Sequence, residues 1–160
     1  MAIKVGDRVP NGTFTVMTGD GPKPKTSDEL FKGKKVVLFA VPGAFTPTCS
    51  NNHLPGFVKN AAAIEAKGID TIAVTGVNDV FVMNAWKKSS GADAIEFLAD
   101  GSANWAKALG LSTDLTERGL GVRSQRYAMV VDDGVVKTLN VEDAPGKADI
   151  SGAENLLKGL

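Results

Sequence analysis

The sequence predicts an α/β fold, in which a mixed β-sheet is flanked by helices. Three observations support this prediction. The run Lys35–Val41 (KVVLFAV) is almost continuously apolar, as expected of a strand buried on both faces. The segments after it alternate between helix and strand patterns as far as Gly91. Near the end of the chain, the turn Asp132–Gly134 separates two β-rich runs and indicates a hairpin.

The segment before the central strand predicts an early hairpin or edge strand and a short helix. Residues 12–16 (GTFTV) alternate with β-branched residues, and the turn-rich stretch 19–24 (GDGPKP) follows. Ser27 is followed by two acidic residues, which favour the positive end of a helix dipole, and Gly33 ends this pattern.

After the central strand, the pattern becomes helical from about Pro47. Apolar residues recur mostly at three- and four-residue steps until Gly68. Pro55 lies inside this predicted helix and cannot donate a hydrogen bond to the carbonyl of Asn51. We therefore expect a kink just after the turn that carries Cys49.

Two further strands and two further helices are predicted in the middle of the chain. Residues 70–75 (DTIAVT) indicate a second buried strand, and Asn78 is a suitable cap for a helix that ends near Gly91. Residues 96–99 indicate a short strand, and residues 104–109 indicate a short helix.

The last third of the chain begins with residues 111–125, which have no clear period and are predicted to form a loop with one turn of helix. The hairpin follows in residues 126–141, and Ser151 is expected to cap a final helix through Leu157. We expect a single domain over residues 1–160. The order of elements fits a thioredoxin-like architecture.

Composition and charge argue against several classes of protein. The 160 residues, 43% of them hydrophobic, suffice to bury about two thirds of the unfolded surface. Lysine and arginine together number 18, as do aspartate and glutamate, so no basic excess favours nucleic acid or a membrane surface. No segment has the apolar length of a signal peptide or of a membrane span. We therefore expect a cytoplasmic protein with no nucleic-acid or membrane partner.

Cys49 is the only cysteine, so the chain cannot form an internal disulfide, and one cysteine with one histidine cannot build a cysteine-rich zinc site. It lies where the apolar strand passes through a turn into the predicted helix. A helix start presents free N–H groups and a positive dipole end, so this thiol should lose its proton more easily than a free cysteine. The alternative is an inert cysteine in the core.

The residues just before Cys49 suit attack on a peroxide. Pro42 and Pro47 stiffen the backbone on both sides of the turn, and Gly43 allows a tight path past a small ligand. The hydroxyl of Thr46 can donate and accept hydrogen bonds toward the sulfur or toward an oxygen bound beside it. A thiolate in such a narrow polar pocket would attack a peroxide and become a sulfenic acid.

Pro42, Thr46 and Cys49 match the PxxxTxxC signature of the peroxiredoxins. The run VPGAFTPTCSNNHLPGF resembles their atypical type II or fifth-type subfamily, in a one-cysteine, bacterial-like form. The resemblance continues through Val77–Asp79 and through Arg126–Val131 (RYAMVV) and covers about residues 35–142. It implies a thioredoxin-like fold, a redox-active thiol peroxidase with no metal or organic cofactor, and a homodimer.

The resemblance also implies a role for each matching residue. Cys49 would attack the hydroperoxide, Thr46 would bind the substrate, Arg126 would hold the thiolate and polarise the peroxide, and Pro42 would shield the pocket. Judged by its residues alone, Arg126 could be an ordinary strand-end arginine, and Arg118 and Arg123 are nearby competitors. The resemblance of RYAMVV selects Arg126.

His53 and several large apolar residues have more than one interpretation. His53 lies four residues after Cys49, on the same helix face, and could be the base of a Cys-His hydrolase. Such an enzyme also needs an orienting group and an oxyanion hole, and the resemblance assigns His53 to a structural segment, HLPGF. Five apolar residues are either core or, by the resemblance, dimer contacts beside the site: Phe45, Phe81, Trp86, Leu115 and Leu120.

A sulfenic acid on Cys49 has no second cysteine to react with inside the chain, so an external thiol must reduce it. Glutathione with glutaredoxin, or thioredoxin, would serve. The sequence thus predicts a peroxidase for hydrogen peroxide and small alkyl hydroperoxides. One alternative is a peroxide sensor that signals through oxidised Cys49. Another, a thiol-disulfide oxidoreductase, is disfavoured because Thr46 occupies the first cysteine position of a C-x-x-C pair.

Overall fold

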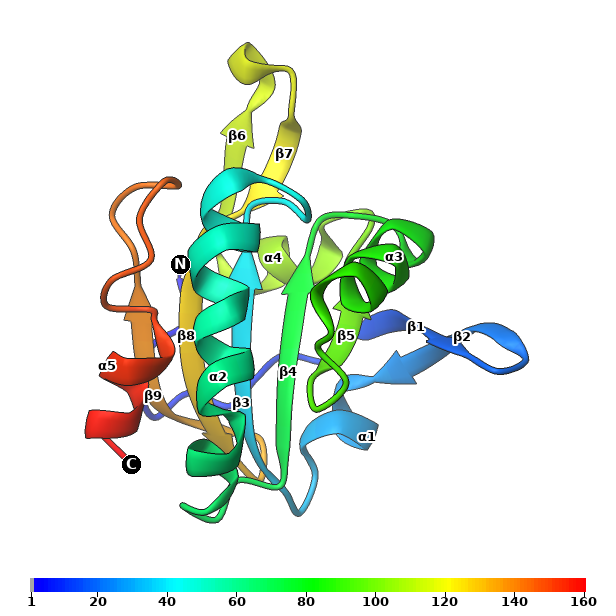
Figure 1. The fold of residues 1–160 in the computed structure, drawn as a ribbon. Helices are drawn as coiled ribbons and strands as arrows, with labels where there is room; N and C mark the ends of the chain where they lie inside the picture. Colours follow the sequence, from blue (N-terminus) through cyan, green and yellow to red (C-terminus); the bar gives the residue numbers. More distant parts are fainter. Residues whose placement is uncertain (1) are drawn as a thin grey trace.

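A mixed β-sheet forms the centre of the structure, which is a computed structural model that describes residues 2–160 (Figure 1). Its strands are β1 (Thr13–Thr18), β2 (Gly21–Thr26), β3 (Lys35–Val41), β4 (Thr71–Gly76), β5 (Glu96–Ala99), β6 (Ser112–Leu115), β7 (Gly121–Ser124), β8 (Tyr127–Asp132) and β9 (Val135–Val141). Within residues 2–160, seven of these strands form one sheet in the order β2-β1-β5-β4-β3-β8-β9, and β6 and β7 pair separately.

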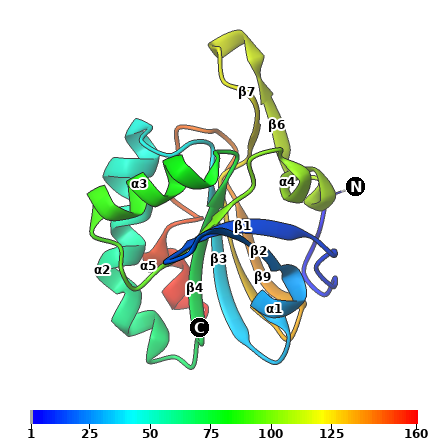
Figure 2. The ribbon, with the colours of Figure 1, turned by 90° about the vertical axis from the view of Figure 1, so that its right-hand side faces the viewer.

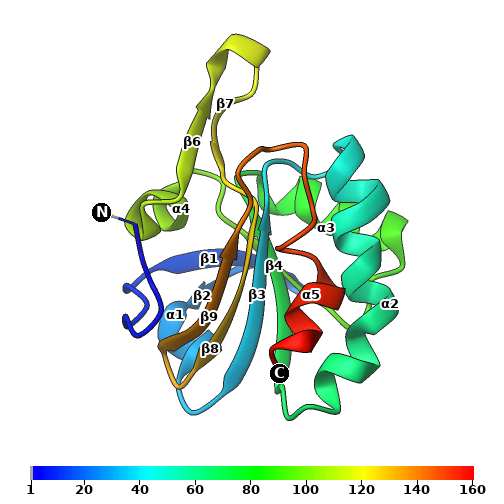
Figure 3. The same ribbon diagram turned by 90° about the vertical axis from the view of Figure 1, so that its left-hand side faces the viewer.

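Helices cover both faces of this sheet. They are α1 (Ser27–Phe31), the π-helical turn η1 (Cys49–His53), α2 (Leu54–Glu65), α3 (Val80–Ser90), α4 (Asn104–Leu109), the 3-10 turn η2 (Thr116–Arg118) and α5 (Ala153–Lys158). Figures 2 and 3 show α2, α3 and α5 on one face and α1 and α4 on the other. The arrangement confirms the predicted α/β class with a mixed sheet flanked by helices.

The central strand is β3, as predicted. It pairs in parallel with β4 and antiparallel with β8. Every residue from Val36 to Val41 is buried, because alternate side chains enter a core on each face of the sheet. Phe39 packs into the core that includes α2, whereas Leu38 packs into the core next to α1 and α4. The strand ends at Val41 and passes the chain directly into the segment that carries Cys49.

The hairpin predicted near the end of the chain is formed by β8 and β9. Asp133 and Gly134 connect the two strands with φ angles of 47° and 81°. Two successive residues with positive φ give a turn whose twist matches that of paired strands, and Asp-Gly is a preferred sequence for it. The early hairpin is also present, as β1 paired with β2.

The structure corrects the predicted capping of two helices. Asp79, not Asn78, caps α3, because its Oδ1 accepts a hydrogen bond of 2.9 Å from the Val82 N–H. Ser151 does not cap the last helix, whose N-cap residue is Gly152. The Asn78 and Ser151 side chains instead make hydrogen bonds to distant segments, and both bonds matter for the site described below.

Residues 111–125 contain the predicted turn of helix, but two short strands flank it in place of the predicted loop. They contain β6, the turn η2 and β7, which together make a hairpin that projects from the body of the fold (Figure 1). The two strands have only four residues each and are mostly half-buried or exposed. Strands of this kind lack the apolar alternation that reveals a strand in a sequence.

Pro55 lies where the chain changes from π-helical to α-helical hydrogen bonding. The chain forms η1 first, in which the Leu54 N–H donates to the Cys49 carbonyl five residues earlier. Pro55 then lies in the first turn of α2, where a missing N–H leaves no helical hydrogen bond unmade. Pro55 thus follows a change from π- to α-helical hydrogen bonding, and the expected kink at this point stays a prediction.

None of the helices within residues 2–160 has the length and apolar character needed to cross a membrane.

Candidate active site

Cys49 lies at the first position of η1, one short segment after the end of β3. Its side chain is completely buried and belongs to the core on the α2 side of the sheet. The structure thus places the thiol at the start of a helical segment, as predicted, where backbone N–H groups and the positive end of the helix dipole face it.

Residues 42–48, which connect β3 to η1, are held in place by hydrogen bonds from both sides. The Ala44 N–H donates to Asn78 Oδ1 at 2.8 Å, so the loop after β4 supports this segment. The Thr46 hydroxyl donates to the Gly43 carbonyl at 2.6 Å and closes the turn. Phe45 adopts a positive φ of 62°, which is unusual for a residue with a side chain, and 53% of its surface is exposed.

The predicted residues therefore take different places around the sulfur. Pro42 is buried beside the thiol segment. The Thr46 hydroxyl donates its one hydrogen bond to the Gly43 carbonyl and not to the sulfur. Its oxygen can therefore still accept a hydrogen bond from another group.

Arg126 is the arginine that contacts Cys49. It precedes β8 and is only 2% exposed, and its Nη2 donates to Cys49 Sγ at 3.0 Å. Nε and Nη2 also donate to the Pro145 carbonyl, at 3.2 Å and 3.0 Å. Nη1 lies 3.0 Å from His53 Nδ1. The guanidinium thus has three neighbours that orient it, and only one of them is the sulfur.

Arg123 has a different function from Arg126 and was not predicted as part of the site. Its Nη1 donates to the Pro42 carbonyl at 3.2 Å, and its Nε donates to the Leu120 carbonyl at 2.8 Å. A Cβ atom at Gly43 would lie 2.9 Å from Arg123 Nη1, so glycine allows this guanidinium to approach the turn. Arg123 therefore links the projecting hairpin to the segment before Cys49. Arg118 is exposed in η2.

His53 is a buried neighbour of Arg126. It is 1% exposed, its ring packs against Phe39 and Phe57, and its Nε2 lies 2.9 Å from the Ser151 carbonyl. Burial and, second, the positive charge of Arg126 lower the pKa of His53 to about 3, although the contact with Ser151 acts in the opposite direction. Because both ring nitrogens have partners other than Cys49, the arrangement does not fit the base of a Cys-His hydrolase.

Ser151 is in turn fixed by a buried carboxylate. Its N–H and its hydroxyl both donate to Glu142 Oε2, at 2.7 Å and 2.6 Å. Glu142 follows β9 and is 7% exposed. Hydrogen bonds therefore run from Glu142 through Ser151, His53 and Arg126 to Cys49, and the segment from Glu142 to Ser151 packs beside the thiol.

The low pKa of His53 leads to a prediction about stability. In the unfolded chain His53 should have an ordinary pKa of 6.5, so between pH 6.5 and about pH 3 the unfolded state binds a proton that the folded state does not. The free energy of unfolding should therefore fall as the pH is lowered through this window, by up to about 1.4 kcal/mol per pH unit from this residue. Urea unfolding at a series of pH values measures the slope.

The matched control for this measurement is His53→Asn, which cannot be protonated at that position. Between pH 6.5 and pH 5, where most carboxyl groups do not yet titrate, the free energy of unfolding of the variant should fall less steeply with decreasing pH. The difference between the two slopes should approach about 1.4 kcal/mol per pH unit, the contribution of one proton. Identical slopes in the two proteins would contradict the neutral, buried state of His53.

The five large apolar residues singled out in the sequence fall into two groups. Trp86 and Leu115 are core residues, and Trp86 Nε1 donates to Ser50 Oγ at 3.0 Å. Leu120 is half-buried. Phe45 and Phe81 are 53% and 65% exposed.

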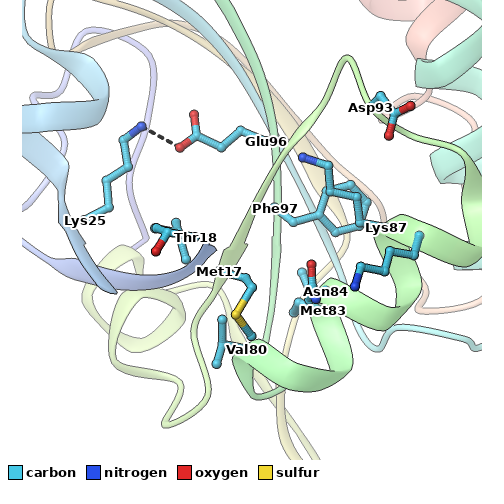
Figure 4. Close-up of a pocket in the computed structure, with 12 residues that line it drawn as sticks. Met17, Thr18, Lys25, Val80, Met83, Asn84, Lys87, Asp93, Glu96 and Phe97 are labelled. Carbon is cyan, nitrogen blue, oxygen red and sulfur yellow. Dashed lines mark hydrogen bonds and ion pairs between the residues drawn. The ribbon is translucent and has the colours of Figure 1, made fainter. Parts of the chain in front are cut away.

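A cavity of about 500 Å³ lies away from Cys49, between the β1–β2 hairpin, α3 and β5 (Figure 4). Lys25 pairs with Glu96 on one side of it, and Lys87 lies over the ring of Phe97, with Nζ 5.9 Å from the ring centroid. None of the residues that line this cavity is a hydrogen-bond partner of the sulfur or of the Arg126 guanidinium. This cavity is therefore separate from the buried surroundings of Cys49 and Arg126.

Known proteins resemble the chain over almost its whole length. The family model for Redoxin matches residues 4–157. Peroxiredoxin-2C of Oryza sativa subsp. japonica is 49% identical over 160 residues, which cover 99% of this chain and 98% of that protein. Chloroplastic peroxiredoxin-2E-2 of the same plant is 52% identical over 165 residues, which cover 99% of this chain and 72% of that protein.

Solved structures agree with this likeness. The crystal structure of reduced Prx3 from Vibrio vulnificus in complex with hydrogen peroxide has a TM-score of 0.94 and 53% sequence identity, and the match covers 98% of each chain. The thioredoxin-like fold and the peroxiredoxin resemblance expected from the sequence are confirmed by these matches.

Proposed function

The chain belongs to the Redoxin family and is a peroxiredoxin, a thiol peroxidase, and on this premise we propose that it reduces hydrogen peroxide and small alkyl hydroperoxides through a sulfenic acid on Cys49. One observation carries the proposal: a fully buried thiol has a guanidinium nitrogen 3.0 Å from its sulfur. A guanidinium at this distance donates a hydrogen bond to the sulfur, and the nucleophilic form of a cysteine is its thiolate.

In the proposed reaction, the Cys49 thiolate attacks one oxygen of the hydroperoxide. A sulfur–oxygen bond forms and the oxygen–oxygen bond breaks, while the hydroperoxide proton passes to the second oxygen, which leaves as water or an alcohol. The sulfenate on Cys49 then takes up one proton from solvent to become the sulfenic acid. Arg126 can donate to the sulfur and to the oxygen on which negative charge develops. Thr46, whose own proton is held by Gly43, can accept a hydrogen bond from the hydroperoxide O–H. Pro42 shields and shapes the pocket.

The burial of the thiol supports a small substrate. Cys49 has no exposed surface, so a bulky group has no direct access to the sulfur. The hydrogen peroxide bound to the related Prx3 of Vibrio vulnificus supports the same substrate here.

The second half of the cycle needs external thiols. The chain has one cysteine, so a thiol from another molecule must attack the sulfenic acid, releasing water and leaving a mixed disulfide on Cys49. A second external thiol then releases Cys49 and forms a disulfide between the two reductant sulfurs. Glutathione with glutaredoxin, or thioredoxin, would supply these thiols. This requirement favours a reducing compartment, and we place the protein in the cytoplasm.

We also propose a homodimer. Phe45, Phe81 and Val122 are exposed by 53%, 65% and 38%, and large apolar side chains exposed close together favour protein contacts. They come from the segment after β3, the start of α3 and the projecting hairpin, which lie at the same end of the fold (Figure 1). A second copy seated there would lie beside the site.

The proposal is tested by peroxide consumption with excess reductant. Sustained consumption is expected with glutathione plus glutaredoxin or with thioredoxin, and comparing the two identifies the electron donor. A dimedone-type reagent followed by mass spectrometry should trap one sulfenic acid per chain on Cys49. A single stoichiometric burst with both reductants would instead favour a peroxide sensor, and no rapid oxidation of Cys49 would contradict both functions.

A further inference from the structure

The Arg126 guanidinium is buried and its direction is set by several acceptors. Nε and Nη2 share the Pro145 carbonyl, Nη2 also reaches Cys49 Sγ, and Nη1 is 3.0 Å from His53 Nδ1. Because Nε and Nη2 share one carbonyl oxygen, the planar guanidinium could still turn about that oxygen, and a second partner on Nη1 is needed to fix the direction of Nη2. His53 is the side chain that faces Nη1.

The partners of His53 determine which of its nitrogens carries the proton. The Ser151 carbonyl can only accept a hydrogen bond, so His53 Nε2 must carry hydrogen to bond to it at 2.9 Å. Arg126 Nη1 can only donate, so His53 Nδ1 must offer a lone pair. The two contacts together require the neutral imidazole with its proton on Nε2.

We propose that His53 is a positioning residue of the peroxidase site: its Nδ1 holds Nη1 of Arg126 and thereby directs Nη2 toward Cys49 Sγ. The Ser151 carbonyl fixes the ring in the required tautomer, and Glu142 fixes Ser151 through two hydrogen bonds. The inference rests on the proposed roles of Cys49 and Arg126 in the reaction. It extends those roles to a residue whose hydrogen bonds go to Arg126 and Ser151 and not to the sulfur.

The energetic cost of an unpaired charged donor supports the need for a hydrogen-bond acceptor at His53 Nδ1, beyond the packing of the ring. Without Nδ1, the Nη1 donor of Arg126 would be buried and unpaired, which is costly for a charged group. A protonated imidazole would place a second positive charge 3.0 Å from the guanidinium. The low pKa of His53, set by burial and by Arg126, agrees with a ring that remains neutral over the working pH range.

Two amide substitutions separate the functions of the two ring nitrogens. In His53→Asn the amide oxygen takes the approximate place of Nδ1 and can accept from Arg126, whereas the bond to Ser151 is lost. In His53→Gln the amide nitrogen takes the approximate place of Nε2 and can donate to Ser151, whereas the acceptor for Arg126 is lost. The two variants differ by one methylene group and each retains one of the two contacts.

The expected result is a loss of rate in only one variant. The second-order rate constant for hydrogen peroxide should fall about 10- to 100-fold in His53→Gln, as expected for a lost hydrogen bond to a charged group, and stay within about threefold of the original in His53→Asn. In an Arg126→Gln background, His53→Gln should cause no further loss. Equal losses in the two variants, or a full further loss in that background, would overturn the inference.

A spectroscopic measurement tests the same inference without any substitution. His53 is the only histidine, so nitrogen-15 labelling of histidine in an untagged chain gives signals from this ring alone. Between pH 5 and pH 7, Nε2 should show the shift of a protonated nitrogen and Nδ1 that of an unprotonated one. A proton on Nδ1, or a charged ring, would overturn the inference. Slow oxidation of Cys49 in the original protein would instead contradict the proposed function.

Discussion

Cys49→Ser is expected to reduce peroxide consumption to the rate of buffer alone. The chain has no other cysteine, so no second thiol can replace the nucleophile. A serine hydroxyl does not ionise near neutral pH, and it cannot accept an oxygen atom to form a sulfenic acid. The initial rate of hydrogen peroxide loss, measured with excess thiol reductant, gives the comparison.

Two control measurements on this variant show that it is folded and that it has lost its thiol. Serine has the same branching as cysteine and is smaller, so it causes no clash and the helical segment from η1 into α2 should still form, which circular dichroism and thermal unfolding can show. A thiol reagent should detect one group per unfolded original chain and none in the variant. Peroxide consumption that persists in a folded Cys49→Ser protein would exclude a thiol mechanism.

Arg126→Gln is expected to lower the second-order rate constant for hydrogen peroxide by about 100- to 1,000-fold. The substitution removes the donor 3.0 Å from Cys49 Sγ and the positive charge beside it. Losses of this size accompany the removal of one fixed donor from a site where negative charge develops. Stopped-flow measurement of Cys49 oxidation, with no reductant present, separates this step from recycling.

Two other arginine substitutions show whether the loss of rate is specific to the guanidinium of Arg126. Arg118→Gln removes an exposed arginine of η2 and should leave the rate constant unchanged. Arg126→Lys keeps a charge but cannot serve the sulfur, Pro145 and His53 together, so it should recover only part of the loss. Removing Arg126 leaves buried acceptors unpaired, so all rates are compared well below each variant's unfolding temperature. An unchanged rate in a folded Arg126→Gln protein would refute the proposed role.

Much of the fold could be predicted because its central elements have strong local patterns. The apolar run of β3 gave its bounds correctly, and so did the short segments of β5 and α4. The Asp-Gly turn located the β8–β9 hairpin, because its backbone geometry requires those residue types. Each of these elements carries its signal within a few residues of sequence.

Other parts of the fold could not be predicted because their stabilising contacts come from distant residues. The β6–β7 hairpin has little apolar surface of its own, and Arg123 ties it to the Pro42 carbonyl across the fold. Asn78 and Asp79 are both good capping residues, and sequence does not show that Asn78 is occupied by the Ala44 N–H.

The site was predictable to the extent that a family motif described it. The motif named Cys49 and Thr46, and RYAMVV selected Arg126, which the structure places 3.0 Å from the sulfur. The functional assignment of these residues stays a prediction until the variants are measured. From the sequence, His53 could be interpreted either as a structural residue or as the base of a hydrolase. Only the fold reveals its contacts, because its partners lie 73 and 98 positions further along the chain.

The hydrogen bonds from Glu142 to Cys49 have a consequence for biosynthesis. The thiol is made before Arg126, Pro145 and the Ser151 carbonyl, which complete its surroundings and lie about 80 to 100 residues further along the chain. A chain still being translated therefore exposes Cys49 without the groups that direct its chemistry. Full reactivity toward peroxide should therefore appear only after the segment that ends at Ser151 has left the ribosome.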